Sequence, residues 1–158
     1  VTIDSTANVT GKVLQVVYAE TTAASTGTTV MVNDDTIPQK TEGYEAITLA
    51  ITPVSSTSRL VITGTVLLYT TAAGQKIWAL FKDDGANAIW AGALYDGDGA
   101  QQNLLVHFTE ISANTTERTY KVRIGLTASY TGTLNGQSGS RRFGAIPKTN
   151  LQITEIEV

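Results

Sequence analysis

Apolar side chains recur at every second residue through seven segments of this chain, and this alternation constrains the fold more than any other feature. Successive side chains of a β-strand point to opposite faces, so a period of two favours strands over helices. Turn-forming residues such as Pro53 and Gly85 separate the segments. The predicted strands are Val13–Tyr18, Ile47–Ile51, Leu60–Leu68, Ile77–Lys82, Leu104–Thr109, Tyr120–Thr127 and Asn150–Val158.

Composition supports the same fold class. Charged residues make up 16% of the 158 residues, below the ~25% of average proteins, and threonine recurs throughout the chain. Threonine is β-branched and polar, which suits the exposed face of a strand. Together with 14 glycines at predicted turns, this pattern predicts one all-β domain with eight to ten strands, arranged as an antiparallel sandwich or barrel.

Charge and hydropathy exclude several function classes. The formal net charge is −3, so we expect no nucleic-acid partner, which would require a strongly basic face. No apolar run approaches the ~20 residues of a membrane-spanning helix, so we expect no membrane insertion. The chain has no cysteine, which excludes disulfides and cysteine-ligated metal sites.

Three of the predicted strands carry apolar residues on both faces: Val13–Tyr18, Leu60–Leu68 and Leu104–Phe108. Scattered exposed apolar residues are normal in soluble proteins. Contact between subunits is the alternative, and the low charge content favours it, so we predict an oligomer.

The last predicted strand contains a break in its alternation. Leu151 and Ile153 fall on one face, whereas Ile156 and Val158 fall on the other. Either a β-bulge near Thr154-Glu155 restores the register, or both faces of the strand are buried. A terminal strand frays unless a sheet holds it, so we expect Asn150–Val158 to be an inner strand or to lie at a subunit seam.

The residues give little support for catalysis or for a bound metal. The single histidine, His107, stands in an alternating apolar run, and Gly136–Ser140 lacks the spacing of a nucleophile elbow. We therefore predict that the protein is not an enzyme and has no cofactor. The acidic stretch from Asp96 to Gly99 lacks the further ligands of a calcium loop, so we expect turns there and no metal site.

Aromatic and arginine side chains near predicted turns are the candidate ligand contacts. Exposed aromatic rings stack on sugars or anchor interfaces, although a tryptophan such as Trp78 or Trp90, taken singly, more often fills the core or a subunit seam. The adjacent guanidinium groups of Arg141 and Arg142 could bind anionic glycans, lie in solvent, or pair with a neighbouring subunit. The full set of candidates is Trp78, Trp90, Tyr95, Asp96, Asp98, Arg141, Arg142 and Phe143.

Four segments together resemble the C-terminal domain of tailed-bacteriophage tail fibres. They are "GKVLQVVYAETT" (Gly11–Thr22), "ITPVSSTSRLVITGTV" (Ile51–Val66), "TTERTYKVRIG" (Thr115–Gly125) and "GSRRFGAIPKTNLQITEIEV" (Gly139–Val158). Residues 1–10 resemble the end of a fibre shaft or a linker, which leaves residues 11–158 as the tip domain. The segments Glu20–Gly43 and Trp78–Gln102 match no motif of this family.

The resemblance implies a β-sandwich of jelly-roll type that forms a homotrimer at the fibre tip, downstream of the shaft. It also implies a receptor on the host cell, either a surface polysaccharide or an outer-membrane protein. The protein would be made in the host bacterial cytoplasm and carried on the virion. A head fibre or capsid decoration protein with a structural role is one alternative, and a carbohydrate-binding module is another. The motifs mark strands and turns, so specificity is expected in the segments outside them.

Overall fold

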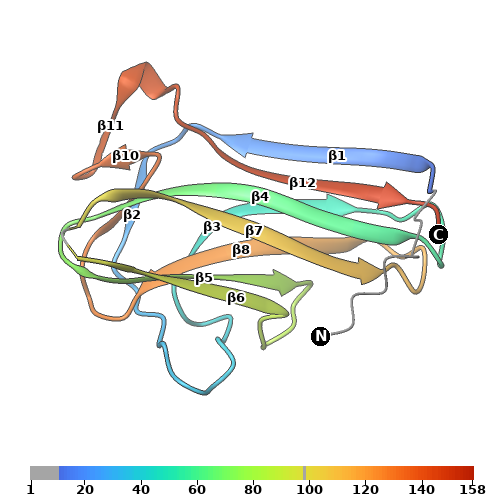
Figure 1. Ribbon diagram of the computed structural model, residues 1–158, viewed down its shortest axis with the longest axis horizontal. Coiled ribbons are helices and arrows are strands. Elements are labelled where there is room, and N and C mark those ends of the chain that lie inside the picture. Colours follow the sequence, from blue (N-terminus) through green and yellow to red (C-terminus); the bar gives the residue numbers. More distant parts are fainter. Residues whose placement is uncertain (1–10, 98) are drawn as a thin grey trace, which may run out of the picture.

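The computed structural model describes residues 11–97 and 99–158, and two packed antiparallel sheets make up most of it (Figure 1). Among the described residues the only helical element is one 3-10 turn, η1 (Phe143–Ala145). The first sheet contains four long strands in the order β1 (Val13–Thr21), β12 (Thr149–Ile156), β4 (Arg59–Thr70) and β7 (Gln101–Ile111). The second contains β3 (Tyr44–Ile51), β8 (Arg118–Leu126), β5 (Gly74–Lys82) and β6 (Trp90–Asp96).

The strand order identifies a jelly roll. Each long strand pairs with its counterpart counted from the other end of the chain: β1 with β12, β3 with β8, β4 with β7, and β5 with β6. Successive pairs alternate between the two sheets, as in a hairpin ribbon wrapped around a core. The predicted all-β antiparallel sandwich of jelly-roll type is therefore confirmed, and all seven predicted strands are present.

Inward-facing side chains of both sheets form the main core. Residues at alternate positions of β4, such as Leu60 and Ile62, are fully buried against inward residues of β8, such as Val122 and Ile124. Because burying one such side chain contributes roughly 1.5–3 kcal/mol, this core is the main stabilising feature of the sandwich.

A second, smaller cluster lies on the outer face of β5. Ile77, Ala79 and Phe81 point away from the main core and are nevertheless buried, because Met31 packs over them. Met31 belongs to the β2–β3 loop (residues 28–43), and its backbone N–H donates to the Leu126 carbonyl at 3.0 Å. On this face the chain covers itself, and no second subunit is needed to bury β5.

The segment between Tyr130 and Phe143 begins with a buried strand, although its glycines suggest a flexible loop. β9 (Gly132–Leu134) is buried and pairs with the end of β4 and with β2 (Ser25–Gly27). The next residue, Asn135, is also fully buried, and its amide donates to the backbone oxygens of Thr21 and Ala23. Satisfied backbone and amide groups hold this part in place, despite its glycines.

The hairpin that follows β9 projects from the sandwich. Its strands are β10 (Gly136–Gln137) and β11 (Ser140–Arg141), and η1 continues from it (Figure 1). The strand β12 ends at the opposite end of the sandwich, beside the start of β1.

The last strand is an inner strand, as predicted, since β12 lies between β1 and β4. The break in its alternation has a different cause from the two that we considered. Its inward positions stay in register through Glu155, and the irregularity lies in the partner strand, between Val13 and Gln15 of β1. A carboxylate therefore occupies an inward position where the pattern called for an apolar side chain.

Hydrogen bonds compensate the buried charge of Glu155. Its carboxylate accepts from the backbone N–H groups of Val54 and Ser55 at 2.9 and 3.1 Å, from the Gln15 amide at 2.6 Å, and from the Ser58 hydroxyl. Burial by itself raises the pKa of Glu155, but the donated hydrogen bonds outweigh burial and hold this pKa below its ordinary value.

This network explains why three of the four family-like segments occur together. Gln15 comes from the first segment, residues 54–58 from the second and Glu155 from the last. Gly11, in the first segment, has a related role, because a Cβ atom there would lie 2.1 Å from the Glu157 carbonyl oxygen. The segments thus mark a structural junction at one end of the sandwich.

The middle of the outer face of the first sheet contains no charged residue, and Glu20 and Arg59 lie in the rows that flank it. The pairing register places outward side chains in rows across β1, β12, β4 and β7. Val16 and Tyr18 on β1 are about half exposed, and Leu105 on β7 is exposed as well. We call this surface the neutral sheet face. One row across it consists of Val16, Thr154, Val61 and Thr109. The next row consists of Tyr18, Gln152, Thr63 and His107.

The three strands with apolar residues on both faces are β1, β4 and β7, which all belong to this sheet. Their inward residues form the core, and their outward residues lie on the neutral sheet face. The oligomer expected from the sequence would therefore use one continuous surface.

Candidate functional site

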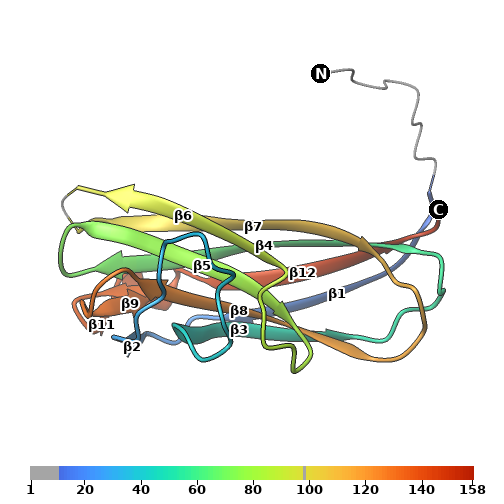
Figure 2. The same ribbon diagram turned by 90° about the horizontal axis from the view of Figure 1, so that it is seen from below.

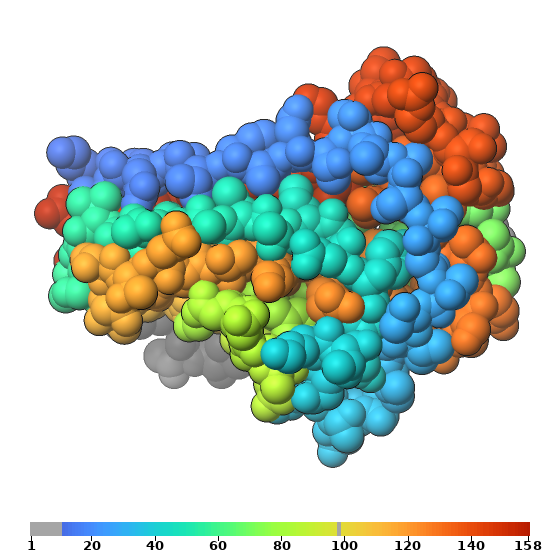
Figure 3. All heavy atoms as spheres, turned by 180° about the vertical axis from the view of Figure 1, so that it is seen from behind, coloured from blue at the N-terminus to red at the C-terminus, as the bar shows by residue number. Residues whose placement is uncertain are grey.

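The two segments without a family motif meet on the second sheet. The β2–β3 loop lies over β5 and reaches β6, which is the edge strand of that sheet (Figure 2). The space-filling view shows the loop as a protrusion beside the segment that joins β5 to β6 (Figure 3). The Gly43 N–H donates to the Val30 carbonyl at 3.0 Å, which closes the base of the loop.

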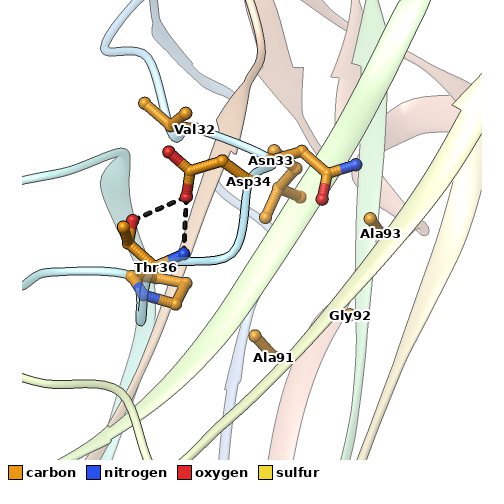
Figure 4. Close-up of a pocket in the computed structure, with 9 residues that line it drawn as sticks. Val32, Asn33, Asp34, Thr36, Ala91, Gly92 and Ala93 are labelled. Carbon is orange, nitrogen blue, oxygen red and sulfur yellow. Dashed lines mark hydrogen bonds between the residues drawn. The ribbon is translucent and has the colours of Figure 1, made fainter.

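A groove separates this loop from β6. It consists of two adjoining hollows of about 210 and 330 Å³, which share Asp34 and Ala91 in their linings. Loop residues from Val32 to Pro38 form one wall, while Ile77, Ala91 and Ala93 form an apolar floor (Figure 4). We call this feature the β6 groove. Sequence reasoning did not predict it, because nothing in residues 20–43 indicates where the loop lies in space.

Polar groups on the wall are held in fixed positions. The Asp34 carboxylate accepts from the Thr36 hydroxyl at 2.6 Å and from the Thr36 N–H at 2.8 Å (Figure 4). Both hydrogen bonds lower the pKa of Asp34, and the bond from the Thr36 hydroxyl has the larger effect. The carboxyl group is therefore ionised at neutral pH. The Asn33 amide donates to the Gln75 side-chain oxygen at 2.8 Å. Gln75 in turn lies opposite Tyr95 in the β5–β6 pairing.

The side chains of Trp78 on β5 and Trp90 on β6 lie together on the core side of the second sheet. Their ring centroids are 6.2 Å apart, and both rings pack against the main core. The Trp78 indole N–H donates to the Leu105 carbonyl at 2.8 Å, which links the second sheet to β7. A Cβ atom at Gly92 would lie 2.8 Å from the Trp78 ring, so glycine leaves room for it. Trp78 therefore serves the fold, whereas Trp90 also lines the larger hollow of the groove.

The remaining candidates near β6 differ in exposure. Tyr95 is 70% exposed and lies on the same face of β6 as Ala91 and Ala93, just beyond the residues that line the groove. Asp96 is buried and forms an ion pair with the fully buried Lys76, so the fold itself occupies this carboxylate. This placement does not suit the receptor contact that we expected of Asp96. Asp98 lies outside the described residues.

The arginine pair occupies the projecting hairpin. Arg141, Arg142 and Phe143 are all exposed, and Phe143 is 74% exposed. The Arg142 Nε–H donates to the Gln137 side-chain oxygen at 3.2 Å within the same hairpin. Figure 1 shows the hairpin and the β2–β3 loop on opposite sides of the sandwich. The predicted candidates therefore fall on two separate surfaces.

The β6 groove is lined by carboxylate, amide, hydroxyl and apolar side chains. Among the described residues that line it, none is histidine, cysteine, lysine or arginine. The described part of the chain contains no cluster of three or more histidine, cysteine or acidic residues able to hold a metal ion.

Within the same residues, no helix is long and apolar enough to cross a membrane. The absence of enzymatic activity stays a prediction.

Comparisons with known proteins identify only distant structural likenesses. No family model and no curated protein sequence matches the chain. It is similar to Eiger TNF from S. frugiperda at 9% identity, over 89% of this chain and 92% of that chain, with a TM-score of 0.47. It is also similar to latent dimeric PorU from Porphyromonas gingivalis at 10% identity, over 89% of this chain and 13% of that chain, with a TM-score of 0.42.

A third likeness is to the VP2 subviral particle of infectious bursal disease virus. The identity is 11%, over 90% of this chain and 39% of that chain, with a TM-score of 0.40. This chain thus spans well under half of both PorU and VP2. At TM-scores below 0.5 these likenesses carry no argument, and the jelly-roll assignment rests on the strand order.

Proposed function

We propose that this chain is the tip domain of a tailed-bacteriophage tail fibre, which forms a homotrimer and binds a receptor on the bacterial surface. The observation that carries the proposal is the meeting of residues 28–43 with β6 at the β6 groove. Both segments lie outside the motifs that resemble tail-fibre domains, whereas the motif residues around Glu155 serve the fold. A shared scaffold with an individual groove is the arrangement expected of a receptor-binding module.

The neutral sheet face supports a trimer of this chain. Obligate interfaces are depleted of charge at their centre, and the rows through Val16 and Tyr18 contain no acidic residue, lysine or arginine. A stable interface buries about 800 Å² per partner, so it would extend beyond these rows toward Leu105 and Ile111, whose rows also contain Glu20 and Arg59 at the rim. Three copies related by a threefold axis would each contribute this sheet.

The direction of the chain is consistent with candidate contacts at the outer end of such a trimer. A shaft preceding residue 11 would join beside the start of β1, at the end of the sandwich where β12 finishes. The hairpin with Arg141 and Arg142 lies at the far end (Figure 1). Tyr95 also lies toward the far end, because it pairs with Gln75 next to the β4–β5 turn.

Direct binding to cells tests the proposal. Fluorescently labelled protein is incubated with a panel of bacterial strains and, separately, with empty capsids of the parent phage. We expect saturable binding to a subset of strains and none to capsids. Binding to capsids without binding to any strain would instead identify a head fibre or decoration protein.

The arginine pair provides a second test. We expect the variant with both Arg141→Ala and Arg142→Ala to remain trimeric and to bind responsive cells several-fold more weakly, because two exposed guanidinium groups are removed. Wild-type binding should fall as salt rises, and this dependence should weaken in the variant. A control with Lys12→Ala and Lys121→Ala removes the same charge away from the hairpin. Loss of the trimer would assign the arginines to a subunit contact, and unchanged mass and binding would assign them to solvent.

A further inference from the structure

We propose that the β6 groove binds an uncharged sugar unit of a surface polysaccharide, with Tyr95 as the stacking platform and Asn33, Gln75 and Asp34 as the hydroxyl-binding groups. This inference rests on the proposed receptor-binding function and assigns its ligand class.

The shape of the groove matches a pyranose ring. Such a ring has an apolar face of C–H groups and a rim of hydroxyls. The floor formed by Ile77, Ala91 and Ala93 is apolar and lacks bulky side chains at its two β6 positions. Tyr95 continues this face of β6 two residues further along, and its ring is mostly exposed. An exposed aromatic ring beside a shallow apolar floor suits the C–H face of a sugar.

Hydrogen-bonding groups lie at the rim where the hydroxyls of the sugar would be. Asp34 uses one carboxylate oxygen for its two bonds to Thr36, which leaves the second oxygen as an acceptor. The bond from Asn33 to Gln75 leaves the Asn33 oxygen as an acceptor and the Gln75 amino group as a donor. Because each group is already fixed by a neighbour, little side-chain entropy is lost when a ligand binds.

The acidic residues that line the groove favour an uncharged ligand over an anionic one. The linings contain Asp34 and Asp35 and, among the described residues, no lysine or arginine. An ionised Asp34 repels the carboxylate or phosphate of an anionic sugar. The cationic side chains that suit such groups, Arg141 and Arg142, lie on the other side of the sandwich (Figure 1).

A sugar also fits better than a peptide strand. A peptide that extended the sheet would need the free backbone edge of β6. The groove instead lies over the outer face of the β5–β6 pair, with Ile77 of β5 in its floor. The Asn33 amide and the Asp34 carboxylate line the wall there, and such groups supply the donors and acceptors that hydroxyl groups require.

Binding to immobilised bacterial surface polysaccharides, with separate neutral and anionic repeats, tests the inference. We expect wild-type protein to bind one or more neutral polysaccharides, and Tyr95→Ala to weaken this binding about tenfold. Gln75→Ala should weaken it several-fold. Asp34→Asn should change it less than about threefold, since the amide carbonyl still accepts from Thr36 and the amide NH2 group can donate to a sugar hydroxyl in place of the lost acceptor. Ile146→Ala is the control, because Ile146 is 75% exposed, against 70% for Tyr95, but lies outside the groove. Thermal melting confirms that each variant is folded.

Three results would overturn the inference. The first is binding only to anionic polysaccharides, with loss of binding on replacing Arg141 and Arg142. The second is binding to neutral polysaccharides that Tyr95→Ala and Gln75→Ala leave unchanged. The third is binding to cells that protease treatment abolishes, with no binding to any polysaccharide, which would identify a protein receptor. In all three cases the proposed receptor-binding function stands. That function is contradicted only if the protein binds none of the strains and none of the polysaccharides.

Discussion

Replacing Thr63 with lysine is expected to convert the proposed trimer into monomers. Thr63 lies near the middle of β4 on the neutral sheet face, between Gln152 and His107 in adjacent strands. In a monomer the lysine side chain extends into solvent. In the proposed trimer each of three charges would be buried without a partner, at a cost of roughly 3–5 kcal/mol apiece.

Sedimentation velocity measures this effect as a change from three times the 16.7 kDa chain mass to the chain mass itself. Ala50→Lys is the matched control, because Ala50 is exposed on the outer face of the second sheet and should leave the trimer intact. If Thr63→Lys remains trimeric, the subunits contact one another through a different surface. The variant should also bind cells far more weakly, because a monomer loses the avidity of three linked sites.

Replacing Glu155 with alanine is expected to lower the free energy of unfolding by about 3–5 kcal/mol, a large share of the 5–15 kcal/mol typical of a domain. The substitution leaves the buried N–H groups of Val54 and Ser55 and the Gln15 amide without their acceptor. Chemical denaturation measures the change. Glu157→Ala is the control, since Glu157 is exposed near the end of the same strand and should change stability by less than about 0.5 kcal/mol.

The pH dependence of the same variant provides a further check. The pKa of Glu155 is lower in the folded protein than its ordinary value, so its contribution is complete above the unfolded pKa of about 4.3. This contribution is lost as the pH falls through the lower folded pKa. Wild-type stability should therefore fall more steeply with acid than that of Glu155→Ala. If the free energy of unfolding falls equally with acid in the two proteins, Glu155 is not ionised in the folded protein.

The sequence was sufficient to predict the sheets because alternation is a local property. The period of two in segments such as Leu60–Leu68 directly reflects which side chains face the core. The same pattern marked β1, β4 and β7 as apolar on both faces, and these strands lie in one sheet. The pattern could not predict Glu155 at an inward position, because its donors come from residues 15 and 54–58, far away in the sequence.

The candidate site was predicted only in part for a related reason. Tyr95, Arg141, Arg142 and Phe143 are exposed, as expected of contact residues near turns. Asp96 looked equally suitable, but Lys76 from the neighbouring strand pairs with it in the interior. The β6 groove depends on where the β2–β3 loop folds back over β5. Met31 determines that position through a long-range contact that leaves no periodic signal in the sequence.

The central claim, that this domain attaches a virion to a bacterial cell, is tested most directly by competition for adsorption. Cells of a strain that the purified protein binds are incubated with that protein and then with the phage that carries it. The account predicts that wild-type protein lowers the adsorption rate in a saturable manner, and that Tyr95→Ala at the same concentration lowers it much less. An adsorption rate that stays unchanged when wild-type protein saturates the cells would contradict the claim.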